Sequence, residues 1–345
     1  MEKGKLDIRN TLLNWFLDSS IFDGEAYLEY YSPTKNGPQY PEITGYAISL
    51  CSILYDREKD TRFLDRAETC AKYMTKITKA GGVPCLRDNI LYTFDTGVYV
   101  SGLFDLYSLI EKQVYLTEAE KSLKWLCSLW NKRQFAAVDR FPEEKDWYHV
   151  PSVHLLKLVV PFMKASKYLE DEKYMETALK LLAKYLQVQN EDGSFRINES
   201  SKVILTHPHC YATEGLLYAY NASKRQEFLE AAKKSSNWLC KTQNSDGSFY
   251  LYYNTGTVAD IRYKRKKIRA TDSTAQATRI WKLLGVNREG IEKAYTYLNS
   301  QLIDNGLRLY RIPSIRASTC SWPTFFYLHS LLLPFGKMEY CKEIF

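Results

Sequence analysis

The chain has 345 residues, of which 45% are hydrophobic and 25% are charged, with a formal net charge of +7. This is the composition of a globular protein, and it excludes a disordered or collagen-like chain. No apolar run reaches the roughly 18 residues of a membrane-spanning helix. The first residues lack the apolar core of a signal peptide, so neither membrane insertion nor a secretion signal is expected.

The eight cysteines are scattered along the chain without a close CxxC pair. Zinc ligands usually come in closely spaced pairs, so neither a metal nor another cofactor is expected. Most of these cysteines fall in apolar helical segments, where a free thiol packs as a small core residue. The sequence therefore predicts a protein of the reducing cytoplasm.

Pairs of predicted helices follow one another along the whole chain, joined by loops with glycine or proline. The first helices of the pairs are predicted at 5–19, 61–79, 116–132, 171–188, 225–242 and 288–302. The second helices are predicted at 42–55, 96–111, 149–167, 209–221, 272–284 and 320–334. Such internal repetition indicates a repeat architecture.

The two helices of each pair differ in polarity. First helices are amphipathic, as in 171–188, where Leu181 and Leu182 lie beside Lys180 and Lys184. Second helices are apolar nearly all round, which predicts burial. Six half-exposed helices alternating with six buried ones predict an all-α (α/α)6 toroid, a single domain over residues 1–345. An open solenoid of the same hairpins is the alternative. Short alternating segments at 249–253 and 307–311 predict strands on the rim.

Alternating rings bring the N-terminal ends of all six inner helices to one end of the toroid. Aligned by eye, these helices carry polar or aromatic residues at positions i, i+4 and i+7, which share one helix face. The i positions are Glu42, Asp95, Tyr148, His207, Asp272 and Ser318, and the i+4 positions are Tyr46, Tyr99, Ser152, Tyr211, Gln276 and Trp322. The i+7 positions include Glu214 and Arg279, which we expect to pair. Charged groups are rarely buried alone, so the stripe predicts paired helices or a wet central funnel.

Candidate site residues come from this stripe and its neighbours. Acids at helix starts are also common as caps, and a lone histidine is often a core or loop residue, but six coincident polar starts favour a site. The candidate catalytic residues are His207, His209, Tyr211, Glu214 and Asp272. The candidate substrate-binding residues are Glu42, Tyr46, Asp95, Tyr99, Tyr148, His149, Gln276, Arg279, Arg316 and Trp322.

Arginines near tyrosine and tryptophan suit an anionic, ring-bearing ligand. A basic run at 262–269 is expected at the rim, with a solvated loop as the alternative. One short basic run without a helical basic stripe does not favour nucleic acid. The expected partner is a glycan or a sugar-containing small molecule, and the sequence carries no signal for an oligomeric state.

Two resemblances to known families rest on short motifs. The segment WLCKTQNSDGSF at 238–249 resembles the QW repeat of squalene-cyclase and prenyltransferase-like toroids, with Phe249 in place of the final tryptophan. DSTAQ at 272–276 is similar to the acid motif DCTAE of triterpene cyclases. This resemblance implies a terpenoid cyclase-like or polyprenyl-binding enzyme with Asp272 as the protonating acid and an aromatic lumen that stabilises cations.

The second resemblance covers nearly the whole chain. PEITGY at 41–46, FDTG at 94–97, YATEGLL at 211–217, DSTAQ at 272–276 and WP at 322–323 are together similar to helical-toroid proteins found with surface-polysaccharide biosynthesis genes. More distantly, they resemble toroidal polysaccharide lyases, uronyl hydrolases and sugar epimerases. This resemblance implies a carbohydrate-active enzyme acting on an acidic, uronate-containing glycan.

Three kinds of activity remain open at this stage. Lyase or epimerase chemistry needs a base, a proton donor and a cation on the carboxylate. His207 or His209, Tyr211 and Arg279 suit these roles. Hydrolysis needs two carboxyl groups, for which Asp95, Glu214 and Asp272 are candidates. The third possibility is a non-catalytic toroid that binds glycan or scaffolds partners.

Overall fold

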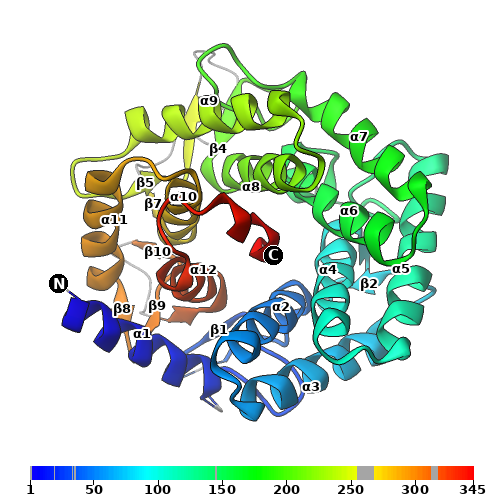
Figure 1. The fold of residues 1–345 in the computed structure, drawn as a ribbon, viewed down its shortest axis with the longest axis horizontal. Coiled ribbons are helices and arrows are strands. Elements are labelled where there is room, and N and C mark those ends of the chain that lie inside the picture. Colours follow the sequence, from blue (N-terminus) through cyan, green and yellow to red (C-terminus); the bar gives the residue numbers. More distant parts are fainter. Residues whose placement is uncertain are drawn as a thin grey trace.

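A computed structural model describes residues 2–18, 20–32, 34, 36–143, 146–254, 268–311 and 318–345. Within these ranges twelve α-helices alternate between an outer and an inner ring, which confirms the predicted (α/α)6 toroid (Figure 1). The outer helices are α1 (Glu2–Leu17), α3 (Thr61–Ile77), α5 (Gln113–Lys132), α7 (Glu172–Leu186), α9 (Gln226–Thr242) and α11 (Arg288–Ser300). The inner helices are α2 (Pro41–Glu58), α4 (Thr93–Ile110), α6 (Val159–Tyr168), α8 (Thr206–Ser223), α10 (Thr271–Leu284) and α12 (Ser321–Leu332).

Inner helices pack closely because small residues stand where they meet. A Cβ atom added at Gly102 of α4 would lie 2.9 Å from Cβ of Ile48 and 3.0 Å from the carbonyl oxygen of Gly45. One added at Gly215 of α8 would lie 2.6 Å from the carbonyl oxygen of Leu156. Glycine therefore sets the spacing of the inner ring, and larger residues at these positions would push the helices apart.

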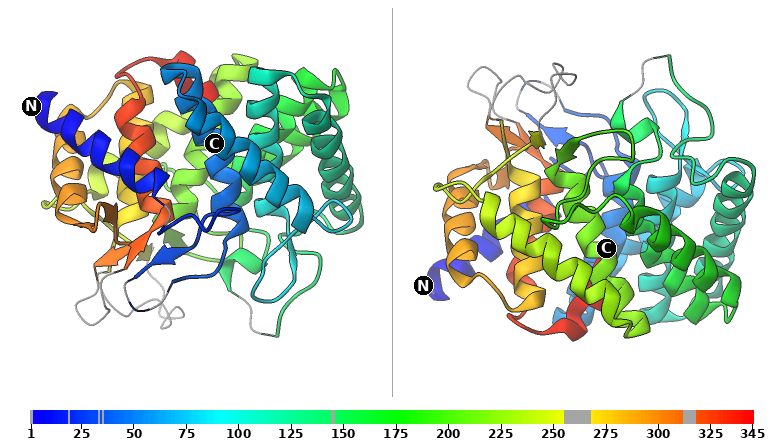
Figure 2. Two further views of the ribbon diagram at one scale, coloured as in Figure 1. Left: turned by 90° about the horizontal axis from the view of Figure 1, so that it is seen from below. Right: turned by 90° about the horizontal axis from the view of Figure 1, so that it is seen from above.

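Short strands gather at one end of the toroid and lead into the inner helices (Figure 2). Four of them, β3 (Leu91–Tyr92), β4 (Val203–Leu205), β7 (Arg269–Ala270) and β11 (Thr319–Cys320), end at the residue before an inner helix begins. The others are β1 (Tyr30–Tyr31), β2 (Val83–Pro84), β5 (Phe249–Tyr250), β6 (Tyr252–Asn254), β8 (Leu302–Ile303), β9 (Gly306–Leu307) and β10 (Tyr310–Arg311).

All the strand pairs are antiparallel, in the orders β1-β11-β9-β8, β10-β7-β5, β2-β3 and β4-β6. The strands expected at 249–253 and 307–311 are among them. Because pairing fixes the residue at which a strand ends, it also fixes where the following inner helix starts.

The opposite end of the ring is filled by the last segment of the chain. After α12 the chain forms the 3-10 helix η4 (Met338–Glu343) and ends near the axis of the toroid (Figure 1). Phe345 is 2% exposed, and its ring centroid lies 4.7 Å from that of His329. Figure 2 shows this segment at the end remote from the strands.

The QW-like segment ties one outer helix to the next. The side-chain amide of Gln243 donates to the carbonyl oxygens of Gly247, at 3.0 Å, and Gly290, at 2.8 Å. Gln189 makes the equivalent bonds to Gly193 and Ala231, at 3.2 and 2.9 Å. These bonds give the motif a structural explanation that does not require terpenoid chemistry.

All eight cysteines are free thiols. Across the described ranges, no helix combines the length and the apolar character needed to cross a membrane.

Candidate active site

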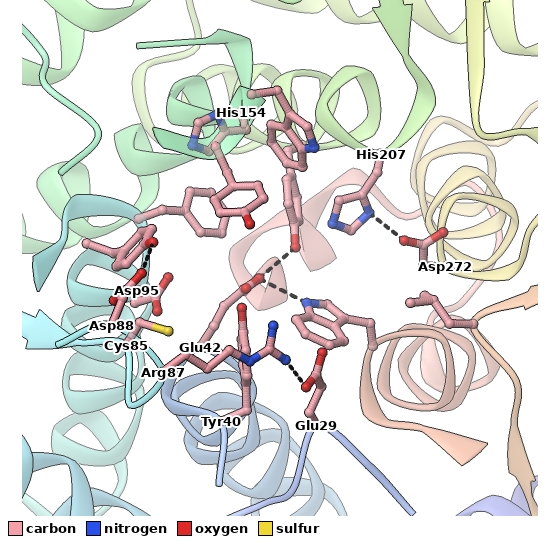
Figure 3. A pocket seen from close by; sticks show the side chains of 17 residues that line it. Glu29, Tyr40, Glu42, Cys85, Arg87, Asp88, Asp95, His154, His207 and Asp272 are labelled. Carbon is pink, nitrogen blue, oxygen red and sulfur yellow. Dashed lines mark hydrogen bonds and ion pairs between the residues drawn. The ribbon is translucent and has the colours of Figure 1, made fainter. Parts of the chain in front are cut away.

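The inner ring has six helical segments, namely the inner helices with the 3-10 helix before α6 counted as the start of the third. The second residue of each segment lines one cavity at the strand-bearing end of the toroid. The cavity has a volume of about 300 Å³ and takes residues from all six hairpins (Figure 3). These second residues are Glu42 in α2, Phe94 in α4, His154 in the 3-10 helix η2 (Val153–Leu158) that leads into α6, His207 in α8, Asp272 in α10 and Trp322 in α12. The N-cap residues before these segments make no side-chain capping bond, and Glu42 and Asp272 lie inside their helices, so neither acid is a cap.

Glu42 lies at the centre of this arrangement. Its Oε1 accepts hydrogen bonds from the Tyr211 hydroxyl, at 3.1 Å, and from Nε1 of Trp322, at 3.0 Å. Burial raises the pKa of Glu42 to about 7, against the opposing effect of these two bonds and of Lys157. A carboxyl group with this pKa can give or take a proton at neutral pH.

Asp95 faces the same cavity from the first turn of α4. It is 6% exposed, and its carboxyl group makes no side-chain hydrogen bond or ion pair with another residue of the described chain. Burial, and then the charge of Glu42, raise its pKa well above the ordinary value. Burial and the neighbouring charge thus both oppose the ionisation of Asp95.

His207 is held by Asp272 across the gap between α8 and α10. Nδ1 of His207 lies 3.2 Å from Oδ2 of Asp272. Burial lowers the pKa of His207, although the Asp272 charge opposes this effect, so the imidazole is neutral at pH 7. The contact does not have the geometry of a hydrogen bond, but a ring proton on Nδ1 would face the carboxylate and would leave Nε2 as an acceptor. An oriented, neutral imidazole is suited to act as a general base.

His154 is a cavity residue that sequence reasoning missed. Its Nδ1 contacts the Ser152 hydroxyl, and its ring packs 5.2 Å from the rings of both Phe94 and Trp147. Burial, with a further effect from His207, lowers its pKa to about 3. Aligning the six inner helices of this chain with one another placed Tyr148 and Ser152 at the start of the third, whereas η2 begins at Val153. A serine directly before a long apolar run is a helix-start signal that could have located it.

A buried charged layer lies beneath the cavity. Lys157 Nζ is 2.7 Å from Oε2 of Glu214, and Nε of Arg279 is 3.5 Å from Oε1 of the same carboxylate. The ammonium group of Lys157 also lies 4.5 Å from the ring centroid of Tyr211 and 5.0 Å from that of Tyr46. The expected Glu214–Arg279 contact is therefore present, but Lys157, which sequence reasoning missed, is the closer partner.

This burial corrects two of the expected roles. The side chain of Arg279 is 0% exposed and that of Glu214 is 1% exposed, and neither lines the cavity. Arg279 is therefore not placed to clamp a substrate carboxylate, and Glu214 is not placed as a catalytic carboxyl group.

His209 and Tyr99 face the outer ring instead of the cavity. His209 is fully buried; its Nδ1 accepts from the main-chain NH of Phe195 at 3.1 Å, and its Nε2 lies 2.9 Å from the Ser235 hydroxyl. The Tyr99 hydroxyl lies 2.7 Å from that of Thr75 in α3. Side chains two positions apart in an α-helix differ in direction by about 200°, so His209 points away from the face that carries His207. Tyr99 is one position out of register in α4, which turns it by about 100°.

Tyr46, Gln276 and His149 lie next to the cavity without lining it. Tyr46 and Gln276 are fully buried, the latter beside His207. His149 accepts at Nδ1 from the main-chain NH of Asp146, at 2.9 Å, so its Nε2 donates to the Tyr92 hydroxyl at 2.8 Å. Tyr92 in turn donates to Asp88 at the cavity edge, at 2.9 Å. His149 thus reaches the cavity through a hydrogen-bonded chain.

The inside of the cavity is acidic and aromatic, as expected. Its carboxyl-bearing residues are Glu29, Glu42, Asp88, Asp95 and Asp272, and its aromatic residues include Tyr148, Tyr211 and Trp322. The one Lys or Arg among the described lining residues is Arg87, which pairs with Glu29. Arg316 and residues 262–267 of the basic run lie outside the described residues.

No family model and no curated protein matches this chain. Its fold is similar to that of cellobiose 2-epimerase from Bacillus thermoamylovorans, with a TM-score of 0.77, 12% identity and coverage of 96% of this chain and 100% of that one. It is also similar to an unsaturated glucuronyl hydrolase from Bacillus sp. GL1, with a TM-score of 0.71, 12% identity and coverage of 96% of each chain. A GH76 α-mannanase from Bacteroides thetaiotaomicron follows, with a TM-score of 0.69, 12% identity and coverage of 95% of each chain. The chain is therefore an (α/α)6 toroid of the fold that these proteins share.

Proposed function

We propose that this chain is a carbohydrate-active enzyme that moves protons in the cavity at the inner-helix starts, and that its reaction is epimerisation or isomerisation of a sugar. The observation that carries the proposal is the neutral His207, oriented by Asp272 in the same cavity as Glu42. The structural neighbours named as sugar epimerases and uronyl hydrolases support the substrate class.

The chemistry follows from the two groups. His207 removes the proton on the carbon next to the carbonyl of an open-chain sugar. The carbonyl oxygen gains negative charge and takes a proton from Glu42, whose pKa of about 7 suits both donation and return. Tyr211 and Trp322 hold the Glu42 carboxyl group in place through their bonds to Oε1. When the enediol turns its other face to His207, the imidazolium returns its proton to the same carbon, and Glu42 takes back the hydroxyl proton as the carbonyl re-forms. Both groups then end in their starting states, and the carbon is inverted.

The substrate we favour is not a uronate. The described cavity offers Arg87 as its one Lys or Arg side chain, and that residue is already paired with Glu29. The faces of Trp147, Tyr148 and Trp322 suit stacking on a sugar ring. The role in surface-polysaccharide metabolism that the sequence resemblance implies stays a prediction.

Glycoside hydrolysis is the second candidate. Glu42 and Asp95 are buried carboxyl groups in one cavity; burial raises the pKa of both, and the charge of Glu42 further raises that of Asp95. One of them can stay protonated as the acid while another carboxylate activates water. A terpenoid cyclase is less favoured, because Asp272 contacts His207 and the cavity carries carboxyl groups in place of a dry lumen. A non-catalytic scaffold is also less favoured, since it gives no reason for the unpaired Asp95.

Incubation of the protein with reducing monosaccharides and disaccharides in D2O tests the proposal. Proton NMR should show deuterium entering at the carbon next to the carbonyl, together with a new epimer or ketose. His207→Ala should lose the exchange, whereas the exposed Asp56→Asn should retain it. New reducing ends without exchange would support hydrolysis instead, and full exchange by folded His207→Ala would overturn the assignment of the base.

A further inference from the structure

The cavity carries more negative charge than the described residues neutralise. Glu29 is paired with Arg87 at the rim. The other four carboxyl-bearing residues that line the cavity form no ion pair with a Lys or Arg of the described chain: Glu42, Asp88, Asp95 and Asp272. Of these, Asp272 faces a neutral histidine and Asp88 accepts from the Tyr92 hydroxyl. The charge deficit is therefore concentrated at Glu42 and Asp95.

Asp95 is the least satisfied of these groups. It is 6% exposed and lines the cavity, yet no other side chain of the described residues bonds to its carboxyl group (Figure 3). Glu42 can accept further hydrogen bonds, because Oε1 accepts both of the bonds from Tyr211 and Trp322 and Oε2 accepts neither. Burying a carboxyl group without a partner is costly, so a pair of this kind calls for a donor or a cation.

A metal ion does not fit this need. No group of three His, Cys, Asp or Glu side chains within the described ranges is arranged to hold a metal ion. An ammonium group fits better, because its N–H donors and its charge satisfy a carboxylate that has no partner among the described side chains. The aromatic side chains Trp147, Tyr148 and Trp322 leave apolar faces for the ring that carries it.

We propose that the cavity selects a sugar that bears a positively charged amino group, with Asp95 as the group that holds the ammonium. The sugar part of this statement rests on the proposed function, whereas the charge part rests on the carboxyl groups alone.

A measurable consequence follows from the raised pKa of Asp95. Burial and the charge of Glu42 raise the pKa of Asp95 in the free protein. A cation placed against Asp95 favours its ionised form, so an amino sugar should release protons to the buffer as it binds. A neutral sugar of the same shape should not.

Isothermal titration calorimetry at pH 7 and low salt tests the proposal with D-glucosamine, D-glucose, N-acetyl-D-glucosamine and D-glucuronate. Glucosamine should bind about tenfold more tightly than glucose or N-acetylglucosamine, and glucuronate should bind most weakly. Repeating the titrations in two buffers of different ionisation enthalpy should reveal proton release with glucosamine but not with glucose. Raising the salt concentration should reduce the preference for the amine.

The isosteric Asp95→Asn should bring the ratio of glucosamine to glucose affinity close to one. Asp56→Asn, which removes the same charge from an exposed position, should leave the ratio unchanged. Equal affinity of the wild-type protein for glucosamine and glucose, or a preference for glucuronate, would overturn the inference while leaving the proposed function standing. Absence of binding by every sugar would defeat both.

Discussion

Removing the charge of Glu42 should make the protein more stable at neutral and alkaline pH. Glutamine keeps an Oε1 acceptor for Tyr211 and Trp322, so Glu42→Gln mimics the protonated wild-type side chain. Burial raises the pKa of Glu42 from 4.5 to about 7, so the folded protein binds a proton more tightly than the unfolded chain does. Ionising Glu42 therefore costs stability.

The size of the effect follows from the two pKa values. A change from 4.5 to about 7 corresponds to about 3 kcal/mol, which wild type loses progressively as the pH rises between those values. Relative to wild type, Glu42→Gln should gain up to about 3 kcal/mol in free energy of unfolding at pH 8. At pH 4.5 only a few tenths of a kcal/mol should remain, and the gain should vanish below that pH, where Glu42 is protonated in both states.

Urea unfolding at pH 4.5 and pH 8, followed by circular dichroism, measures this difference directly. The variant should also lose turnover, because glutamine cannot exchange the proton that the proposed reaction needs. Equal or lower stability of the variant at pH 8 would show that the ionised Glu42 is well supported in the fold, and the assignment of Glu42 as a neutral-pH acid would fail.

Three further predictions separate structural from catalytic residues. Glu214→Gln strands the buried charge of Lys157 and should cost about 3–5 kcal/mol in urea unfolding, and a loss below 1 kcal/mol would contradict the buried pair. His207→Ala should leave the melting temperature nearly unchanged, whereas Tyr211→Phe loses the bond to Glu42 and should cost about 1 kcal/mol. Both should lower turnover at least about 100-fold, and wild-type turnover by either would remove it from the mechanism. His209→Ala breaks buried bonds to the main chain and α9 and should cost about 1–3 kcal/mol without changing activity per folded molecule. A selective loss of activity in the folded His209 variant would restore that residue to the site.

The architecture was predictable because it depends on averages over many residues. In α7 the residues Tyr174, Ala178, Leu181 and Tyr185 are buried on one face, whereas α4 is buried on nearly every side. This contrast is visible in the sequence as amphipathic helices alternating with apolar ones. A shift of one or two residues at a helix end leaves the pattern intact, so the ring order survives errors in the boundaries.

The site was less predictable because it depends on single boundaries. Glu42, His207 and Asp272 were placed in the correct register, since each follows the first residue of its helix. His154 was missed because the third inner segment begins with a 3-10 helix at Val153, a start that periodicity does not reveal. Lys157 was missed because a lysine in an apolar run gives no sign that it will be buried against a carboxylate.

One geometric rule accounts for both the correct and the missed residues. At the second position of an inner segment a side chain points into the cavity, and one position further along the helix the direction turns by about 100°. Strands β3, β4, β7 and β11 set that position for four of the six inner segments, because each ends where a helix begins. The six second-position residues therefore form a common part of the cavity, and Asp95, at the third position of α4, adds a carboxyl group to it. The buried layer of Lys157, Glu214 and Arg279 lies beneath them and can stay constant when those residues change. Substitution at the second positions should consequently alter the reaction or substrate of this toroid with little effect on its fold.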